Sequence, residues 1–190
     1  MRVLVGCEYS GRVREAFRAR GHDAWSFDLL PAEDGSPYHM QWDVLDFLDW
    51  GWDLAIFHPP CTHLAVSGSR WFKAKALEQA EALAFVRALL NANIPKIALE
   101  NPVSIISTQI RKPSQVVHPW MFGTPESKAT CLWLKGLPPL VPTDDVRKTM
   151  LSLPKRTTDR VHHASPGPDR WKDRSRTDPG LADAMGLQWG

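Results

Sequence analysis

Cysteine is scarce in this sequence, and a long apolar run is absent. Three cysteines among 190 residues are too few for the disulfide framework of a small secreted domain. No apolar run approaches the roughly 18 residues that cross a bilayer, which excludes a membrane-spanning protein and a membrane partner. The first apolar stretch is broken at Glu8, too early for a signal peptide. We therefore expect the protein to reside in a reducing cytoplasm.

The chain also lacks a strong net charge, since its formal charge is only +2. The charge is unevenly distributed, because residues 148–176 hold eight basic and three acidic side chains and the remainder of the chain totals −3. Such a basic segment is typical of proteins that contact phosphates, although a solvated surface loop has the same composition. The predicted nucleic-acid contacts in this segment are Arg170, Lys172, Arg174 and Arg176.

Strand and helix patterns alternate over the first hundred residues. Short apolar runs predict strands over 3–5, 24–27, 53–57 and 96–99, with another near 42–44. Helical patterns cover 11–19, which Gly21 closes, and 73–91. In the longer helix, the predicted apolar face contains Leu77, Ala80, Leu83, Ala84 and Leu90. A late strand at 131–134 and a short helix at 181–185 lie on either side of a proline-rich basic segment at 136–176.

This alternation predicts an α/β fold in which a mostly parallel sheet is covered by helices on both faces. The length suits one domain of 1–190, since domains commonly hold about 100–200 residues. In such sheets, ligands bind beyond the carboxyl ends of the strands. Polar residues follow the predicted strands at those ends, at positions 8–11, 28, 43, 58–61 and 100–102.

Cys61 directly follows the pair Pro59–Pro60, where the chain must leave a strand because proline cannot continue the hydrogen-bonding ladder. This position turns the thiol out of the sheet edge, whereas Cys131 lies inside an apolar run, as a structural cysteine does. Glu100 ends the next predicted strand, so its carboxyl group and the Cys61 thiol can face one substrate. Two reactive groups at neighbouring strand ends predict an active site.

Two simpler interpretations stand beside this one. Glu8 and Asp28 are also the residue types that cap helices or occupy solvated turns. His58, Cys61 and His63 could ligate zinc. That site would need a fourth ligand folded back from elsewhere, with His118, His162 and Cys131 as the available residues. We predict that the protein holds no metal.

The segments 59–61 and 100–102 resemble the nucleophile loop and the Glu-Asn dipeptide of the DNA cytosine-5 methyltransferases. The resemblance covers most of residues 1–135, and the whole chain is similar to short methyltransferase-like proteins of bacteriophages. It implies a Rossmann-like class I methyltransferase fold, S-adenosyl-L-methionine as cofactor, and DNA as partner in the host cytoplasm. Residues 177–180 and the helix up to Trp189 are similar to the family's last motif, which packs beside the cofactor.

By this resemblance, the catalytic residues are Cys61, Glu100 and Lys128. The cofactor-binding residues are Glu8, Tyr9, Ser10, Gly11, Asp28, Leu29, Asp43 and Pro59. Among them, Asp28 would hold the cofactor ribose and Asp43 would lie near the adenine amine. The family's first glycine-rich loop is reduced here to Gly11, and its large target recognition domain is absent. We therefore expect a weak sequence preference that depends on a short context.

The chemistry of the family explains these residue types. Attack of a thiolate on carbon 6 of cytosine turns carbon 5 into a nucleophile that can accept a methyl group. Glu100 would stabilise the developing charge through ring nitrogen 3 and the exocyclic amine, for which we expect burial to raise its pKa toward neutrality. In a duplex, the base must first be flipped out.

The identity of the acceptor is open at this point. Single-stranded DNA, RNA and a free cytosine nucleotide all remain possible substrates. The alternative to an enzyme is a non-catalytic nucleic-acid-binding protein derived from a methyltransferase. That alternative needs the basic segment 148–176 but makes no use of Cys61.

Overall fold

We describe the fold from a computed structural model of the chain. The structure describes residues 1–71, 73–160, 167 and 170–190; at 69–71, 73, 170, 171 and 173 it describes the backbone only. The predicted nucleic-acid contact Arg170 therefore has its side chain outside this description. His162, considered above as a zinc ligand, lies outside the described residues altogether.

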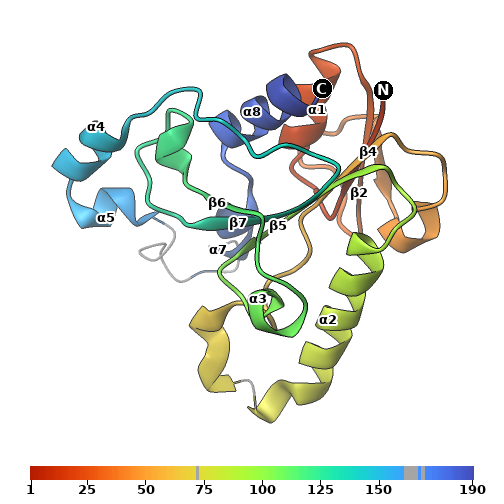
Figure 1. Cartoon of the computed structure of the whole chain (residues 1–190), viewed down its shortest axis with the longest axis horizontal. Helices are drawn as coiled ribbons and strands as arrows, with labels where there is room; N and C mark the ends of the chain where they lie inside the picture. Colours follow the sequence, from red (N-terminus) through yellow and green to blue (C-terminus); the bar gives the residue numbers. More distant parts are fainter. Residues whose placement is uncertain (72, 161–166, 168–169) are drawn as a thin grey trace.

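The centre of the fold is a seven-stranded sheet with the strand order β3-β2-β1-β4-β5-β7-β6 (Figure 1). The strands are β1 (Arg2–Gly6), β2 (Asp23–Asp28), β3 (His39–Gln41), β4 (Leu54–Phe57), β5 (Lys96–Pro102), β6 (Gln115–Val117) and β7 (Thr130–Lys135). The pairs from β3 to β5 are all parallel, whereas β7 is antiparallel to both β5 and β6. This is the mostly parallel α/β sheet that the sequence predicts.

Helices cover both faces of the sheet, as predicted. The α-helices are α1 (Arg12–Arg18), α2 (Ala76–Leu90), α3 (Ile106–Gln109), α4 (Arg147–Ser152), α5 (Lys155–Thr158), α7 (Arg170–Ser175) and α8 (Pro179–Trp189). Four 3-10 helices complete the set: η1 (Val44–Phe47), η2 (Val66–Trp71), η3 (Lys73–Lys75) and η4 (Pro119–Met121). No helix within the described residues is both long and apolar enough to cross a membrane.

The alternation of side chains along the strands divides the core into two clusters. On β1, Val3 and Val5 pack with α1 and α8, whereas Leu4 packs with α2 on the opposite face. Both faces are buried because the connections between parallel strands place helices on each side. The contact between α1 and α8 is close: a Cβ atom at Gly186 would lie 2.8 Å from the carbonyl oxygen of Ala16.

The predicted apolar face of α2 is partly wrong. Leu83 and Leu90 are buried as expected, but Leu77, Ala80 and Ala84 are exposed. Two residues that the prediction omitted, Val86 and Leu89, are fully buried instead. The reason is geometric: the N-terminal turns of α2 extend beyond the sheet (Figure 1), so that an apolar residue there has no strand to pack against.

Other boundaries also differ from the prediction. The strand expected at 96–99 continues to Pro102, and the final helix runs to Trp189. The strand expected near 42–44 ends earlier, at Gln41, and Val44 begins η1 instead. Glu100 therefore lies within β5 rather than after it.

We expect two leucine truncations in α2 to have very different effects on stability. Leu89→Ala should lower the free energy of unfolding by about 2–5 kcal/mol, because it leaves a cavity in the core. Leu77→Ala on the same helix should change it by less than about 0.5 kcal/mol, because the side chain is already solvated. Urea denaturation of both variants measures the difference. Equal losses would mean that α2 packs on the sheet through the face predicted from the sequence.

Candidate active site

The strand order reverses between β1 and β4, which is where an open α/β sheet forms a ligand-binding crevice. The loop from Cys7 to Gly11 begins this region. The amides of Cys7 and Glu8 donate to the carbonyl of Phe27 at 2.7 and 3.3 Å, and Cys7 has a left-handed backbone with φ of 60°. Gly11, with φ of 72°, is the N-cap of α1. The loop therefore turns sharply from β1 into α1.

Glu8 stabilises the start of α1. Glu8 is buried, with 4% of the residue exposed. Its carboxylate accepts hydrogen bonds from the amides of Val13 at 2.6 Å and Arg14 at 3.2 Å. Burial raises the pKa of Glu8, and the positive charge of His58 and these two amides oppose the rise. The helix-cap interpretation of Glu8 thus describes its contacts in the structure.

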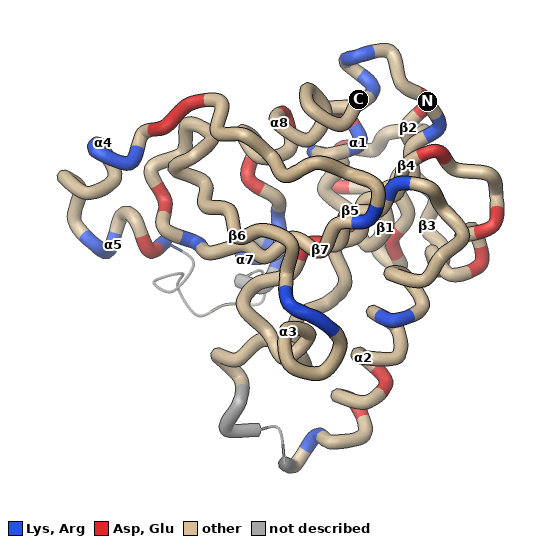
Figure 2. The backbone as a smooth tube through the Cα atoms, in the orientation of Figure 1, with Lys and Arg blue, Asp and Glu red and all other residues tan. Residues whose placement is uncertain are grey.

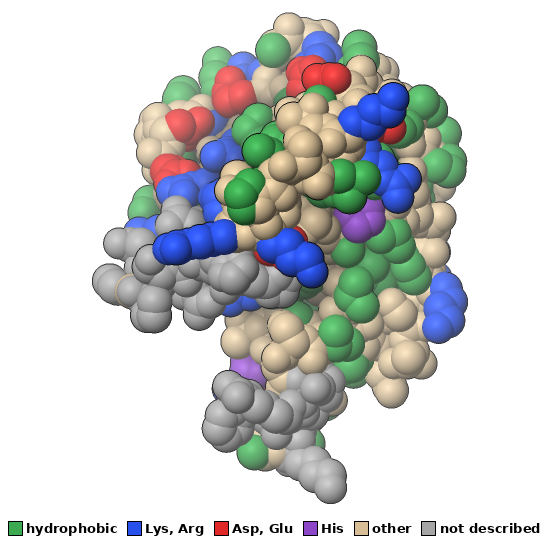
Figure 3. All heavy atoms as spheres, turned by 90° about the vertical axis from the view of Figure 1, so that its left-hand side faces the viewer, with side chains coloured by type: hydrophobic (Ala, Val, Ile, Leu, Met, Phe, Trp, Pro, Cys, Tyr) green, Lys and Arg blue, Asp and Glu red, His purple; other side chains and the backbone are tan. Residues whose placement is uncertain are grey.

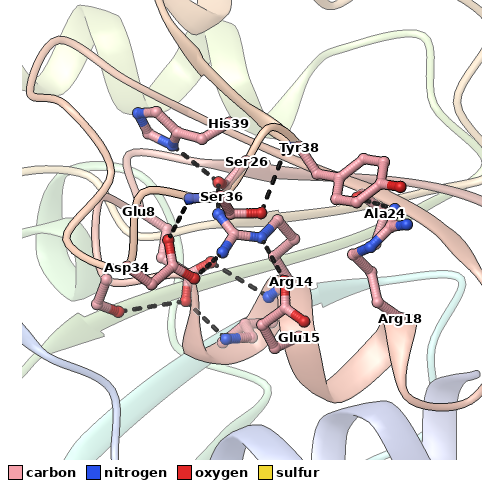
Figure 4. A network of polar contacts seen from close by, with 12 residues as sticks. Glu8, Arg14, Glu15, Arg18, Ala24, Ser26, Asp34, Ser36, Tyr38 and His39 are labelled. Atoms are coloured by element: carbon pink, nitrogen blue, oxygen red, sulfur yellow. Dashed lines mark hydrogen bonds and ion pairs between the residues drawn. The ribbon is translucent and has the colours of Figure 1, made fainter.

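Arg14 fixes the loop that follows β2 (Figure 4). Its buried guanidinium donates to Ser26 Oγ at 2.7 Å, to Glu15 Oε1 at 2.9 Å and to the carboxylate of Asp34. Asp34 belongs to the loop after Asp28, so this ion pair holds that loop against α1. A buried charge with three partners therefore holds the loop after β2 beside α1.

Asp28 and Asp43, the two predicted cofactor carboxylates, lie on the same side of this crevice. Asp28 ends β2, and its Oδ1 accepts from the amide of Leu30 at 2.9 Å; burial raises its pKa. Asp43 caps η1 by accepting from the amide of Leu45 at 2.9 Å. Burial, followed by the charges of Asp28 and Asp43, raises the pKa of the Cys7 thiol. Cys7, which the sequence reasoning missed, therefore lies near both carboxylates.

Cys61 and Glu100 are brought together by the pairing of β4 and β5. The chain leaves β4 through Pro59, whose carbonyl accepts a hydrogen bond of 2.9 Å from the buried side-chain amide of Asn101. Cys61 then begins a turn in which its carbonyl accepts from the amides of Leu64 and Ala65, at 3.0 and 2.9 Å. Cys61 is exposed, as predicted from its position after the proline pair.

The electrostatics of Glu100 differ from the prediction. Burial acts to raise its pKa, but the hydrogen bond from His58 Nδ1 at 3.3 Å and the positive charge of Lys128 outweigh burial, and the pKa of Glu100 is lowered. The expectation of a carboxyl group shifted toward neutrality is therefore wrong for the protein without substrate. The sequence offered no sign of this, because the two cations lie 42 and 28 positions away in the chain.

The thiol of Cys61 has opposing charges around it. Its pKa is raised by burial of the sulfur and by the charge of Glu100, and this rise is opposed by Lys128 and Arg174. The resting form at neutral pH is therefore the thiol. A ligand that neutralised Glu100 would remove one of the two effects that raise the pKa of Cys61 and would shift the balance toward the thiolate.

The basic helix α7 lies against both halves of the site. The hydroxyl of Tyr9 donates to the carbonyl of Lys172 at 3.1 Å, and Lys128 Nζ donates to the carbonyl of Arg174 at 3.3 Å. Arg176, beyond the helix, forms an ion pair with Glu33. The predicted nucleic-acid contacts with described side chains are thus adjacent to the predicted catalytic residues.

A pocket joins these elements. Its lining includes Glu100 together with five basic residues, namely Arg12, Lys128, Arg160, Arg174 and Arg176. The segment similar to the family's last motif closes it, because Arg12 Nη1 donates to the carbonyl of Thr177 at 2.6 Å and Asp178 caps α8.

Basic residues are not concentrated in one patch on the outside of the molecule. Figure 2 shows them along α4 and α5 and also beside α3. Figure 3, which views this side of the molecule, shows them interspersed with acidic and apolar side chains.

The zinc interpretation finds no support among the described residues, which contain no group of three or more potential metal ligands. His118 Nδ1 lies 3.0 Å from the carbonyl of Ser127, and Cys131 is buried in β7.

Comparisons with known proteins found no matching family model and no matching curated protein. A solved structure of a candidate DNA modification methyltransferase encoded within an E. coli prophage is similar, with a TM-score of 0.47 and 14% sequence identity. The similarity covers 70% of this chain and 46% of the prophage protein. The chain thus spans about half the length of that protein.

The lowered pKa of Glu100 predicts a specific dependence of stability on pH. The ionised carboxylate stabilises the fold fully above the ordinary pKa of 4.5, and this contribution disappears as the pH falls through the lower folded value. We expect the difference in unfolding free energy between wild type and Glu100→Gln to shrink as the pH falls from 7 to about 3. Urea denaturation at several pH values measures it. The matched control is Glu81→Gln at an exposed position of α2. If the difference in unfolding free energy between wild type and Glu100→Gln did not change with pH, the lowered pKa of Glu100 would be contradicted.

Proposed function

We propose that this protein is an S-adenosylmethionine-dependent DNA methyltransferase that modifies carbon 5 of cytosine through a covalent bond to Cys61. The observation that carries the proposal is the proximity of Cys61, Glu100 and Lys128 at one edge of the sheet, where Glu100 and Lys128 have opposite effects on the pKa of Cys61 and Lys128 lowers the pKa of Glu100. Glu100 and Lys128 line one pocket, and a thiol beside a carboxylate and an ammonium group supplies what nucleophilic attack on a cytosine ring requires.

The crevice between β1 and β4 has the side chains that suit the cofactor. Asp28 and Asp43 are carboxylates able to accept from ribose hydroxyls and an adenine amine, and Leu29 beside them is 71% exposed and apolar. Their negative charge also suits a cofactor that carries an ammonium and a sulfonium group. When bound, S-adenosylmethionine supplies an electrophilic methyl group. The residues Glu8, Tyr9, Ser10, Gly11 and Pro59 would shape this crevice through the loop contacts described above.

The reaction then follows from the positions of the side chains. Cys61 gives its thiol proton to solvent, and the thiolate then forms a bond to carbon 6 while the electrons of the ring double bond move toward carbon 5 and ring nitrogen 3. Glu100 hydrogen-bonds to nitrogen 3 and the exocyclic amine, and Lys128 offsets negative charge beside it. After carbon 5 is methylated, its proton leaves to solvent and the Cys61–carbon 6 bond breaks, which restores the aromatic ring and the thiolate.

DNA is the proposed acceptor because α7 provides phosphate contacts beside the same pocket. Arg174 lines the pocket together with Glu100 and Lys128, Arg12 extends the positive charge toward α8, and Lys172 contacts Tyr9 through its carbonyl. A free nucleotide would not need a basic segment of this length. With no target recognition domain, these contacts would read the backbone and give a weak sequence preference.

Replacement of the nucleophile gives the most direct test of the proposed activity. Cys61→Ala should abolish transfer of a labelled methyl group to DNA, while binding of S-adenosylmethionine is retained because the thiol acts on the base. Mass spectrometry of nucleosides detects 5-methylcytosine, and the neighbouring exposed Thr62→Ala is the control.

A second readout uses DNA containing 5-fluorocytosine, which should trap a covalent adduct on Cys61 in the wild type. Normal turnover by Cys61→Ala would rule out the covalent mechanism. A wild type that methylates neither DNA nor RNA would favour the binding-protein alternative.

The role of α7 predicts a change in salt dependence. Lys172→Ala/Arg174→Ala should weaken DNA binding and reduce the slope of log K against log salt by up to about 1.8, since each phosphate contact contributes roughly 0.9. Fluorescence anisotropy at several salt concentrations measures the slope. The charge-matched control Arg87→Ala/Lys112→Ala, far from the pocket, should leave it unchanged. An equal effect of both pairs would mean that DNA binds through overall charge rather than at α7.

A further inference from the structure

His58 is a buried histidine whose contacts the proposed function does not use. Its side chain is 7% exposed, and its Nδ1 lies 3.3 Å from Glu100 Oε2. Its Nε2 is buried and has no hydrogen-bond partner within the described part of the chain. The amide of His58 donates to the carbonyl of Gly6 at 2.9 Å. The imidazole is therefore held next to Glu100, and Glu100 is its one hydrogen-bonding partner among the described side chains.

Charged groups from four elements surround this imidazole. Glu8 follows β1 and Asp28 ends β2, and a positive charge on His58 opposes the rise in pKa that burial causes at both carboxyl groups. On the other side, Glu100 lies on β5, with Lys128 beyond it before β7. The imidazole of His58 therefore lies near the carboxyl groups of Glu8, Asp28 and Glu100, and the ammonium group of Lys128 lies near Glu100.

The proposed reaction needs a proton that Glu100 itself does not hold in the resting protein. Ring nitrogen 3 of cytosine carries a lone pair, which an ionised carboxylate would repel. A proton on Glu100 converts this repulsion into a hydrogen bond, and a group in contact with the carboxylate can deliver that proton directly. His58 Nδ1 is in contact with the carboxylate that requires it.

We propose that His58 supplies Glu100 with the proton that reaches ring nitrogen 3 when Cys61 attacks carbon 6, an inference that rests on the proposed function. As the sulfur–carbon 6 bond forms, the proton on His58 Nδ1 moves to the Glu100 carboxylate and passes from there to nitrogen 3. His58 has then lost one proton, nitrogen 3 has gained one, and Glu100 is again an ionised carboxylate. When the sulfur leaves, nitrogen 3 returns the proton along the same path, so the pair ends the cycle as it began. His58 is a positioning residue that acts through Glu100.

The test replaces His58 with a residue that keeps the hydrogen bond but holds no transferable proton. His58→Asn should lower kcat about 100-fold with an unchanged KM for DNA. Its activity should also be lost at a lower pH than that of the wild type, because only Glu100 protonated from solvent is then competent. The pH dependence of adduct formation with 5-fluorocytosine DNA in single-turnover experiments measures the effect on the step itself.

A double variant separates this role from a structural one. Gln at position 100 cannot receive a proton, so Glu100→Gln/His58→Asn should form the adduct at the same rate as Glu100→Gln. A further loss in the double variant, or an unshifted pH profile in His58→Asn, would overturn the inference. His58→Gln serves if His58→Asn does not fold. If the wild type forms neither adduct nor methylated nucleoside, the proposed function fails; if the wild type is active and the pH profile is unshifted, only the role of His58 fails.

Discussion

The parallel register between β4 and β5 is the constraint on which the candidate site depends. Each residue of β4 pairs with the residue 42 positions later, from Leu54 with Lys96 to Phe57 with Leu99. The same offset continues past the strand, where His58 meets Glu100 and Pro59 accepts from Asn101. Because the proline pair cannot extend the ladder, a side-chain bond replaces the backbone bonds there. A shift of register by one residue would separate the ion pair and the cysteine loop together.

The charged side chains of Glu8, Arg14 and Glu100 are each stabilised by a different set of hydrogen-bond partners. Glu8 is satisfied by the helix amides of α1, and Arg14 by three side-chain oxygens. Among the described side chains, Glu100 has one hydrogen-bond partner, His58, and Glu100 also lines a pocket. A buried charge with incomplete pairing costs stability, and incomplete pairing leaves hydrogen-bonding capacity for a substrate. By this criterion Glu8 is structural and Glu100 is the group built to act.

The sequence predicted the strand ends well because apolar runs that stop at a polar residue or proline are local signals. The pairing of Cys61 with Glu100 followed from adjacency of two strands. The direction of the Glu100 pKa shift could not be predicted in this way, because it depends on His58, just after β4, and Lys128, just before β7, which tertiary structure brings to Glu100. The exposed Leu77 has the same origin: periodicity identifies an apolar face, but only the position of the sheet shows how much of that face is covered.

Helix α7 connects the two halves of the proposed reaction. Its carbonyls accept from Tyr9, in the loop that begins the cofactor crevice, and from Lys128, beside Glu100. A phosphate that draws Lys172 or Arg174 toward DNA would act on a helix already bonded to both places. Binding of DNA would therefore change the position of Lys128 and the crevice loop together, and Lys128 sets the charges of Cys61 and Glu100. This short helix would thus make the proposed chemistry depend on the presence of DNA.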